Sequence, residues 1–312
     1  MKHQEFCFEG KLIKTEQNRY YTQNAETLIE AMNAGVILEG TSYLCDRDRQ
    51  LHIKLGDIDG IIPRDECIYT AEGLPEKDIA ILSRVGKAVC FKVLGIDKDE
   101  NGNTCAILSR REAQKECMRE KIVHLSSGDV IEAKITRLDP FGAFCDIGCG
   151  IISLLPIDCM SVSRISHPRD RFRNGQIIKA VVKNSADEYG RITLTHRELL
   201  GTWEENASRF SSGQTAAGIV RSIEKYGVFI ELAPNLAGLA ECREDVQVGQ
   251  IAAVFIKNIV PDRMKVKLAI IDCGDFESTV PDYDYPDVSH IDHWRYSPDE
   301  CDKVIESVFD RV

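Results

Sequence analysis

The sequence predicts a mainly β protein made of three small five-stranded barrels, joined by short helices and followed by an acidic C-terminal tail. The first observation is a spaced motif that recurs three times, which indicates an architecture of repeats. The second is the make-up of each copy. About five short runs of β-branched and apolar residues, separated by Gly, Pro, Asp and Asn, are typical of a small closed antiparallel barrel. The third is the length of 312 residues, which suits two or three small domains.

The second and third copies carry the clearest repeat. The stretch 128–147 returns at 213–232 with a constant offset of 85 positions. Three further pairs of blocks match between the two copies: those that begin at Gly150 and Gly238, at Gly175 and Gly249, and at Arg191 and Lys265. A more degenerate first copy begins near Gly35. The repeat therefore extends over most of the chain.

Helical stretches are expected to separate the copies, at 22–33, 110–121 and 197–210. The first of them should stop at Gly35, because glycine is the usual residue after a helix C-terminus. The expected domains are an N-terminal lead-in with a helix (1–34), a first repeat (35–112), a helical connector (113–125), a second repeat (126–198), a second helical connector (199–210), a third repeat (211–271) and the tail (272–312).

The net charge of −11 is concentrated at the C-terminal end. Residues 272–312 contain 12 acidic and three basic residues, so the tail carries −9 and the remainder of the chain only −2. The acidity therefore does not exclude a polyanionic partner for the repeats. The apolar stretches are far shorter than the ~20 residues that a bilayer requires. The N-terminus has no signal-peptide pattern, so a cytoplasmic location and no membrane partner are expected.

Neither a catalytic motif nor a metal motif stands out. The patterns GxxxxGK[ST], HExxH and GxSxG are absent, which favours a protein that is not an enzyme. The pair Cys145 and Cys149 lacks the four convergent ligands of a zinc site, as do His290 and His293 with the nearby cysteines. The twelve cysteines are expected to be reduced thiols. We therefore expect no metal, no cofactor and no small-molecule substrate.

Residues 35–271 resemble the RNA-binding domain family named after the S-one protein of the bacterial small ribosomal subunit. The most specific element is a series of blocks that is nearly complete in the second copy: Gly-x-Val, aromatic-Gly-x-Phe, Gly-Leu/Ile-x-x, Gly-Gln-x-x, and an Asp followed later by Arg-Ile-x-Leu. The resemblance implies five-stranded OB-type barrels that bind single-stranded RNA. Periodicity alone leaves several barrel families open.

The resemblance also implies RNA-contacting residues in the second copy. Aromatic faces stack on unpaired bases, and nearby cations hold phosphates. By similarity, the positions are Phe141 and Phe144 as a stacking platform, Ser153 where the family often has His, and Asp187 with Arg191 near the last strand. Strict strand alternation would place the two rings on opposite faces, so a shared platform requires a turn or bulge at Gly142. The alternative is that one of the rings lies in the core.

A basic loop lies between the expected third and fourth strands of the second copy. Its four arginines are Arg164, Arg169, Arg171 and Arg173, and they are interpreted as phosphate contacts. The alternative is a solvated loop without a partner. The third copy keeps Tyr226 and Phe229 as its aromatic pair, with Lys225 and Arg221 alongside and Glu241 at the family's His position. Because Glu241 would repel phosphate, RNA binding by the third copy is less secure than by the second.

The first copy departs from the pattern. Arg49 and His52 stand where the aromatic pair is expected, and Pro63 replaces a polar residue after Gly60. Stacking should be weak there, and the copy would suit docking to a protein.

The tail has two expected features. Ser297-Pro298-Asp299-Glu300 has the signals of a helix start, so a helix to about Phe309 is predicted. The apolar Trp294 and Tyr296 favour docking of the tail on the third barrel or its connector. The charge of −9 should then oppose RNA binding at low salt.

Together these inferences predict a non-enzymatic cytoplasmic protein that binds single-stranded mRNA and acts in translation at the small ribosomal subunit. Two alternatives stay open: a protein-interaction scaffold of barrels that have lost RNA binding, and an accessory RNA-binding factor in RNA decay or transcription.

Overall fold

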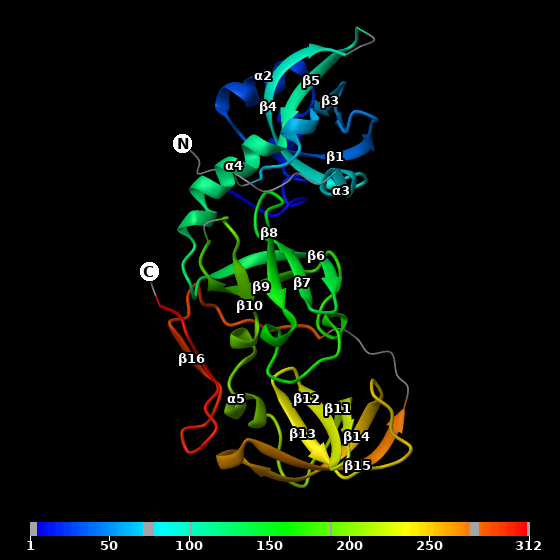
Figure 1. The fold of residues 1–312 in the computed structure, drawn as a ribbon, viewed down its shortest axis with the longest axis vertical. Coiled ribbons are helices and arrows are strands. Elements are labelled where there is room, and N and C mark those ends of the chain that lie inside the picture. The colour runs from blue at the N-terminus through cyan, green and yellow to red at the C-terminus, as the bar shows by residue number, and fades with distance from the viewer. Residues whose placement is uncertain (1–4, 71–77, 100–101, 188, 275–280, 311–312) are drawn as a thin grey trace. The chain divides into compact units, whose positions relative to one another are not determined.

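Three closed five-stranded β-barrels follow one another along the chain in the computed structural model, as the sequence predicts (Figure 1). The structure describes residues 5–70, 78–99, 102–187, 189–274 and 281–310. The chain divides into two compact units. The first unit contains residues 1–125 together with the short segments 146–152 and 186–191, and the second contains the rest.

The first barrel is preceded by two helices, α1 (Glu16–Tyr21) and α2 (Ala25–Ala34). Its strands are β1 (Leu38–Cys45), β2 (Leu51–Leu55), β3 (Ile58–Ile62), β4 (Ala88–Lys98) and β5 (Thr104–Ser109). The 3₁₀-helix η1 (Arg64–Glu66) and helix α3 (Asp78–Leu82) lie between β3 and β4. The strand order is β1-β2-β3-β5-β4, with β3 and β5 parallel and β1 closing on β4.

The helix α4 (Arg110–Glu120) and the 3₁₀-helix η2 (Ile122–His124) lead out of the first barrel. The strands of the second barrel are β6 (Val130–Asp139), β7 (Gly142–Asp146), β8 (Ile152–Pro156), β9 (Ile177–Asn184) and β10 (Thr193–Thr195). The long β8–β9 connection holds the 3₁₀-helices η3 (Ile157–Cys159) and η4 (Pro168–Asp170). Its third and fifth strands, β8 and β10, are parallel.

The third barrel repeats this topology. Its strands are β11 (Thr215–Glu224), β12 (Gly227–Ala233), β13 (Leu236–Ala240), β14 (Ile251–Val260) and β15 (Lys265–Gly274), with the 3₁₀-helix η6 (Pro261–Arg263) before β15. Glycines allow the walls of this small barrel to approach its core. A Cβ on Gly218 would clash with Ile230, and a Cβ on Gly238 would clash with Leu268. The interior is otherwise filled by buried aliphatic side chains.

The first two expected helices are confirmed, and the third is only partly correct. Asn24 and Thr27 form a capping box at the start of α2, and Gly35 ends that helix in the left-handed conformation. At the start of α4, the Ser109 hydroxyl accepts a hydrogen bond from the backbone N–H of Glu112. The third stretch is broken at Gly201 into the 3₁₀-helix η5 (Arg197–Leu200) and the helix α5 (Trp203–Ala207).

The helix predicted from Ser297 to about Phe309 is wrong. The tail instead forms a two-stranded hairpin of β16 (His293–Arg295) and β17 (Glu306–Val308). The Ser297 hydroxyl does not cap a helix: it donates to the carbonyl of Lys303 at 2.7 Å and accepts from the N–H of Ile305 at 2.8 Å. These two bonds close the loop of the hairpin.

The docking of the tail on the third barrel is confirmed within the second unit. Trp294 and Tyr296 belong to the buried cluster that contains the core of the third barrel. The backbone N–H of Trp203 donates to the carbonyl of Tyr296 at 3.0 Å, which ties the hairpin to the connector helix α5.

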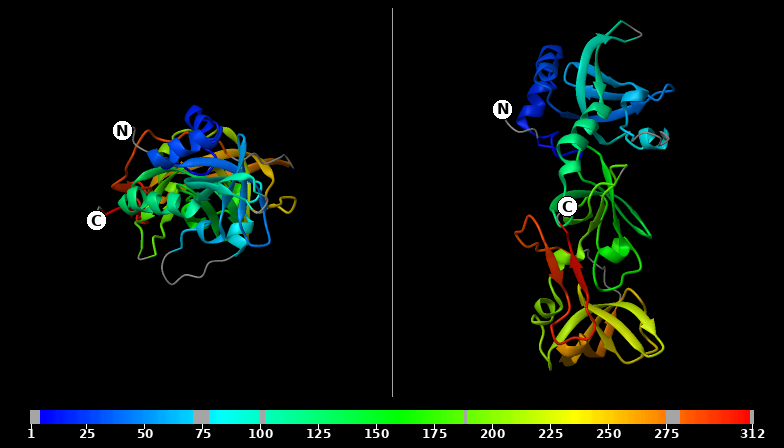
Figure 2. Two further views of the ribbon diagram at one scale, coloured as in Figure 1. Left: turned by 90° about the horizontal axis from the view of Figure 1, so that it is seen from above. Right: turned by 60° about the vertical axis from the view of Figure 1, so that its left-hand side comes forward.

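The segment 281–292 runs along the second barrel before the hairpin begins (Figure 2). The N–H of Val130 donates to the carbonyl of Ser289, and the N–H of Ile291 donates to the carbonyl of Gly128, both at 2.9 Å. The tail thus contacts both barrels of the second unit.

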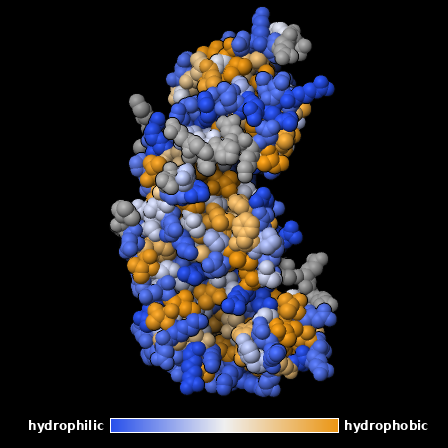
Figure 3. Space-filling model, viewed as in Figure 1, coloured by the Kyte–Doolittle hydropathy of each residue, from blue (hydrophilic) through white to orange (hydrophobic). Residues whose placement is uncertain are grey.

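No helix in the described ranges is both long and apolar enough to cross a bilayer. On the face drawn in Figure 3, apolar residues lie in small patches between hydrophilic ones.

Candidate nucleic-acid interface

The aromatic pair of the second barrel forms a shared surface feature. Pro140 and Phe141 make the turn between β6 and β7, which lets Phe141 lie on the same side as Phe144 although the two are three residues apart. The ring centroids are 5.8 Å apart with an interplanar angle of 89°. Phe141 is 55% exposed, and Phe144 is half-buried. Neither ring is in the core, so the alternative with one core ring is wrong.

Arg137 completes this platform and was missed by the sequence reasoning. Its guanidinium carbon lies 4.5 Å from the centroid of the Phe144 ring, and its Nη2 donates to Asp139 at 2.6 Å. The side chain is largely exposed. Counting outward from the turn at Pro140 and Phe141 would have found it, because residues equally distant from a hairpin turn become cross-strand neighbours.

Ser153 is not at this surface, and its prediction as an RNA contact is wrong. The residue is buried, and its hydroxyl donates to the carbonyl of Ile192. The parallel pairing places Leu154 beside Thr193, and in the third barrel Leu239 beside Lys267.

The error is a slip in the alignment of the repeats. Since Arg191-Ile-Thr-Leu matches Lys265-Val-Lys-Leu, Thr193 corresponds to Lys267, and Ser153 therefore corresponds to Gly238 inside the barrel. By the same register, Pro156 occupies the position of Glu241. The sequence repeat instead aligns Gly150 with Gly238, three residues away from the structural register.

Arg171 is likewise misassigned as a phosphate contact. Its side chain is completely buried, and its guanidinium donates to both carboxylate oxygens of Glu231 at 2.9 and 2.6 Å. Arg221 donates to the same carboxylate at 2.9 Å and pairs with Asp170. This buried network joins the second and third barrels and leaves Arg171 and Arg221 inaccessible to RNA. Burial next to a partner 60 positions away cannot be read from the loop sequence.

The other three arginines of this loop are exposed and stay predicted phosphate contacts: Arg164, Arg169 and Arg173. Lys225 is also exposed, directly before Tyr226 at the β11–β12 turn.

The expected pairing of Asp187 with Arg191 is present in the first unit. The Arg191 guanidinium and backbone N–H each contact the Asp187 carboxylate at 2.8 Å. The pKa of Asp187 is lowered by the backbone hydrogen bond from Arg191 and then by its side chain. Arg191 also lies over the ring of Tyr189, 4.8 Å from its centroid. A role of this pair in RNA binding stays a prediction.

A groove of about 550 Å³ crosses the third barrel beside its aromatic pair. Tyr226 is 69% exposed, and its ring lies 6.0 Å from that of Phe229. The groove is also lined by three lysines that the sequence reasoning missed: Lys257, Lys265 and Lys267. The alternation of Lys265, Val266, Lys267 and Leu268 was a usable signal, because every second residue of a strand faces outward.

Glu241 lines the same groove but is paired. Its carboxylate accepts from the Lys257 ammonium at 2.8 Å, and this hydrogen bond lowers the pKa of Glu241. The ion pair reduces the repulsion of phosphate that the sequence predicts for Glu241. The lining therefore contains three lysines and one carboxylate, and that carboxylate is ion-paired with Lys257.

Among its described residues, the first barrel has no comparable pair of exposed aromatic rings. Arg49 has a positive φ of 65° and pairs with Asp78 at 3.2 Å, while His52 contacts Asp46 at 2.9 Å. Tyr43, missed by the sequence reasoning, is 49% exposed with its ring 6.2 Å from His52. One aromatic ring next to carboxylates is a weaker platform than those of the other barrels.

Other chemistry is not indicated. All twelve cysteines are free thiols. Within the described ranges, no group of three or more His, Cys, Asp or Glu side chains is arranged to hold a metal ion.

Comparison with known proteins agrees with this surface. Residues 125–197 match the S1 RNA binding domain family. The chain is 29% identical over 202 residues to the small ribosomal subunit protein bS1 homolog of Bacillus subtilis, which covers 62% of this chain and 50% of the relative. It is 30% identical over 178 residues to the bS1 homolog of Bacillus cereus, covering 55% of this chain and 44% of the relative. The chain thus spans about half the length of these curated relatives.

A solved multidomain protein with nucleic acid binding domains from Streptococcus pneumoniae covers 76% of this chain and is covered over 74% of its own length. The identity is 13% and the TM-score is 0.24, which is too low to establish a shared arrangement of domains.

Proposed function

We propose that this chain, with its S1 RNA binding domain at residues 125–197 and its similarity to bS1 proteins, is a single-stranded RNA-binding protein that acts in translation with the small ribosomal subunit. Its role is binding rather than catalysis, and it works in the cytoplasm, where the ribosome is. The observation that carries the proposal is the pair of exposed aromatic platforms, each accompanied by cations, on the second and third barrels.

The chemistry of these platforms suits unpaired bases. Every base has a π-face, so stacking on Phe141 and Tyr226 accepts any sequence, and each stacked base contributes roughly 1 to 3 kcal/mol. T-shaped ring pairs fix the edge of one ring against the face of the other, so the platform is organised before RNA binds. Little sequence preference is therefore expected.

Phosphates are assigned to the cations near these rings. Arg137 serves the second barrel together with the exposed loop arginines, and the three groove lysines and Lys225 serve the third. Phosphate contacts release counterions from the strand, so affinity falls as salt rises.

The first barrel supports a second candidate function, docking to a protein. Arg49 and His52 are held by Asp78 and Asp46, and neither side chain offers a large stacking face. A barrel of this kind could attach the chain to the ribosome while the other two hold mRNA.

The test is fluorescence anisotropy of the full-length protein with a labelled poly-pyrimidine RNA at two salt concentrations. We expect binding at low salt that weakens as salt rises. An absence of binding at low salt would reject RNA as the ligand and favour the scaffold alternative.

A further inference from the structure

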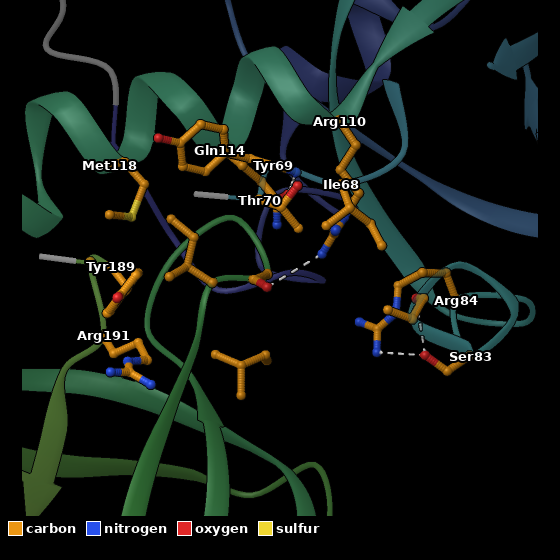
Figure 4. A pocket seen from close by; sticks show the side chains of 15 residues that line it. Ile68, Tyr69, Thr70, Ser83, Arg84, Arg110, Gln114, Met118, Tyr189 and Arg191 are labelled. Atoms are coloured by element: carbon orange, nitrogen blue, oxygen red, sulfur yellow. Dashed lines mark hydrogen bonds between the residues drawn. The ribbon is translucent and has the colours of Figure 1, made fainter. Parts of the chain in front are cut away.

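A pocket of about 300 Å³ lies in the first unit, apart from the aromatic pairs of the other barrels (Figure 4). Its described wall comes from residues 68–70, from the end of α3 and the turn after it, from α4, and from the turns at 150–152 and 189–191. All of these segments belong to the first unit. The volume is at the lower end of the range of roughly 300 to 1,000 Å³ that is usual for small-molecule sites.

The wall of this pocket is basic although the chain is acidic. Its described lining includes Arg84, Arg110 and Arg191, and it includes no Asp or Glu. The carboxylates that pair with these arginines, Glu9 and Asp187, are not among the lining residues. A ligand in the pocket would therefore meet guanidinium groups rather than carboxylates, which favours an anion.

Arg84 keeps hydrogen-bonding capacity for such an anion. Its Nη1 lies 3.4 Å from the Glu9 carboxylate and its Nη2 donates to the Ser83 hydroxyl at 3.3 Å, both long contacts. Its Nε is buried and has no hydrogen-bond partner among the described residues. Arg110 differs in that each of its three guanidinium nitrogens has an acceptor: Glu9 at 2.7 Å and two backbone carbonyls at 3.2 and 3.4 Å. A phosphate group would accept the charge-assisted bonds that Arg84 can still donate.

Two tyrosines add flat surfaces to the same pocket. Tyr189 is 40% exposed, and the guanidinium of Arg191 lies 4.8 Å from its ring centroid, which holds the ring in place. Tyr69 is 37% exposed, and its backbone N–H donates to the side chain of Gln114 at 2.9 Å. In Figure 4, Tyr189 and Arg191 lie toward one side of the pocket, and Arg84 and Ser83 toward the other.

We propose that this pocket binds a nucleotide, with the base stacked on Tyr189 and the phosphate held by Arg84. Exposed aromatic rings recognise a base by stacking on it. Guanidinium N–H groups that can still donate hydrogen bonds recognise a phosphate. The ligand is either a free mononucleotide or one unit of an RNA strand, since both present the same base and phosphate. The site involves none of the platform rings, so it does not depend on the RNA-binding surfaces of the other barrels.

The test uses the full-length protein with both platforms removed by Phe141→Ala, Phe144→Ala, Tyr226→Ala and Phe229→Ala. This background is titrated calorimetrically with UMP, with AMP and with the trinucleotide UUU. We expect saturable binding of the mononucleotides. Adding Tyr189→Ala should weaken it roughly fivefold to a hundredfold, the range expected for one lost stacked base. Tyr189→Phe should restore the affinity, because the ring is kept.

Tyr20→Ala is the matched control, because Tyr20 is an exposed tyrosine of the same unit that does not line the pocket. It should leave binding unchanged. Tighter binding of UUU than of UMP would identify an RNA strand as the source of the nucleotide, and equal affinities would identify a free nucleotide. Absence of mononucleotide binding, or binding that Tyr189→Ala leaves intact, would overturn the proposal. Neither result would bear on RNA binding by the protein with intact platforms, which is measured separately.

Discussion

At the scale of single residues, burial decides which of the basic and polar side chains can meet a ligand. Phe141 and Phe144 could be predicted from sequence because an aromatic-Gly-x-Phe turn forms locally. Arg171 could not, since its role depends on Glu231, which reaches it only when two barrels pack together. Ser153 was misplaced because a three-residue slip between glycines is invisible without the strand register.

Substitutions of the buried Arg171 and the exposed Arg169 should have opposite effects. Arg171→Met should lower the free energy of unfolding of the second unit by about 3 kcal/mol or more, because it leaves a buried carboxylate undercompensated. It should leave the salt dependence of RNA binding unchanged. Arg169→Gln, two positions away and exposed, should do the opposite: stability is kept, and the slope of log affinity against log salt falls by about 0.7. Urea unfolding and anisotropy at several salt concentrations measure both. A reduced salt slope for a folded Arg171→Met protein would contradict the assignment.

His196 gives the second unit a pH dependence. It is buried, its Nδ1 donates to the carbonyl of Met160 at 3.1 Å, and its Nε2 accepts from the Tyr285 hydroxyl at 2.9 Å. Burial lowers the pKa of His196 to about 4. The unfolded chain binds a proton at its ordinary pKa of ~6.5. Between pH ~6.5 and 4 only the unfolded state binds this proton, so the free energy of unfolding is at its full value above pH ~6.5 and decreases as the pH falls toward 4.

We expect the free energy of unfolding to fall by about 2 kcal/mol between pH 7 and pH 5 from this residue alone. Urea unfolding at the two pH values checks it. His196→Gln should reduce the difference by that amount. An equal pH dependence in the wild type and in His196→Gln would rule out this origin.

At the scale of elements, the barrels were predictable and the tail was not. Apolar and polar residues that alternate between turn residues specify strands wherever one face of the sheet is buried. This alternation is why the three barrels could be predicted. The helix-start signal of Ser297-Pro-Asp-Glu is local. The burial of Trp294 and Tyr296 in the third barrel's cluster outweighs it, so a hairpin forms instead of a helix. The β-branched Val308 in β17, with Val304 and Ile305 just before it, also favours a strand.

The hairpin should therefore stabilise the third barrel. Trp294→Ala should cost about 3 to 5 kcal/mol in the free energy of unfolding, as for other large buried aromatic residues. Val308→Ala, at a 62% exposed position of the same hairpin, should cost less than about 0.5 kcal/mol. Chemical unfolding followed by circular dichroism measures both. A small effect of Trp294→Ala would mean that the tail does not support the barrel.

At the scale of the whole molecule, the acidic tail is fixed on the second unit through backbone contacts at Gly128 and Val130. Its charge is held near the barrels without covering the rings of Phe141 or Tyr226, which stay exposed. Repulsion of RNA by the tail is thus a long-range effect, screened beyond a Debye length of ~10 Å at 0.1 M salt. Deletion of the tail would remove Trp294 and Tyr296, so charge neutralisation is the better test.

Replacing the exposed Asp282, Asp284 and Asp287 by Asn should tighten RNA binding at low salt, by about twofold to fivefold for screened charges of this kind. The gain should vanish at 0.5 M salt, where screening is nearly complete. Anisotropy at both salt concentrations measures it. Equal or weaker RNA binding by the triple Asn variant at low salt would mean that the tail has a structural role only.

The central claim is that the aromatic pairs of the second and third barrels bind RNA together. The most direct measurement is the affinity of full-length protein for one poly-pyrimidine RNA after Phe141→Ala with Phe144→Ala, after Tyr226→Ala with Phe229→Ala, and after all four changes. Each pair should cost about 2 to 5 kcal/mol, and the fourfold variant should cost more than either pair. Unchanged affinity of a correctly folded fourfold variant would contradict the account.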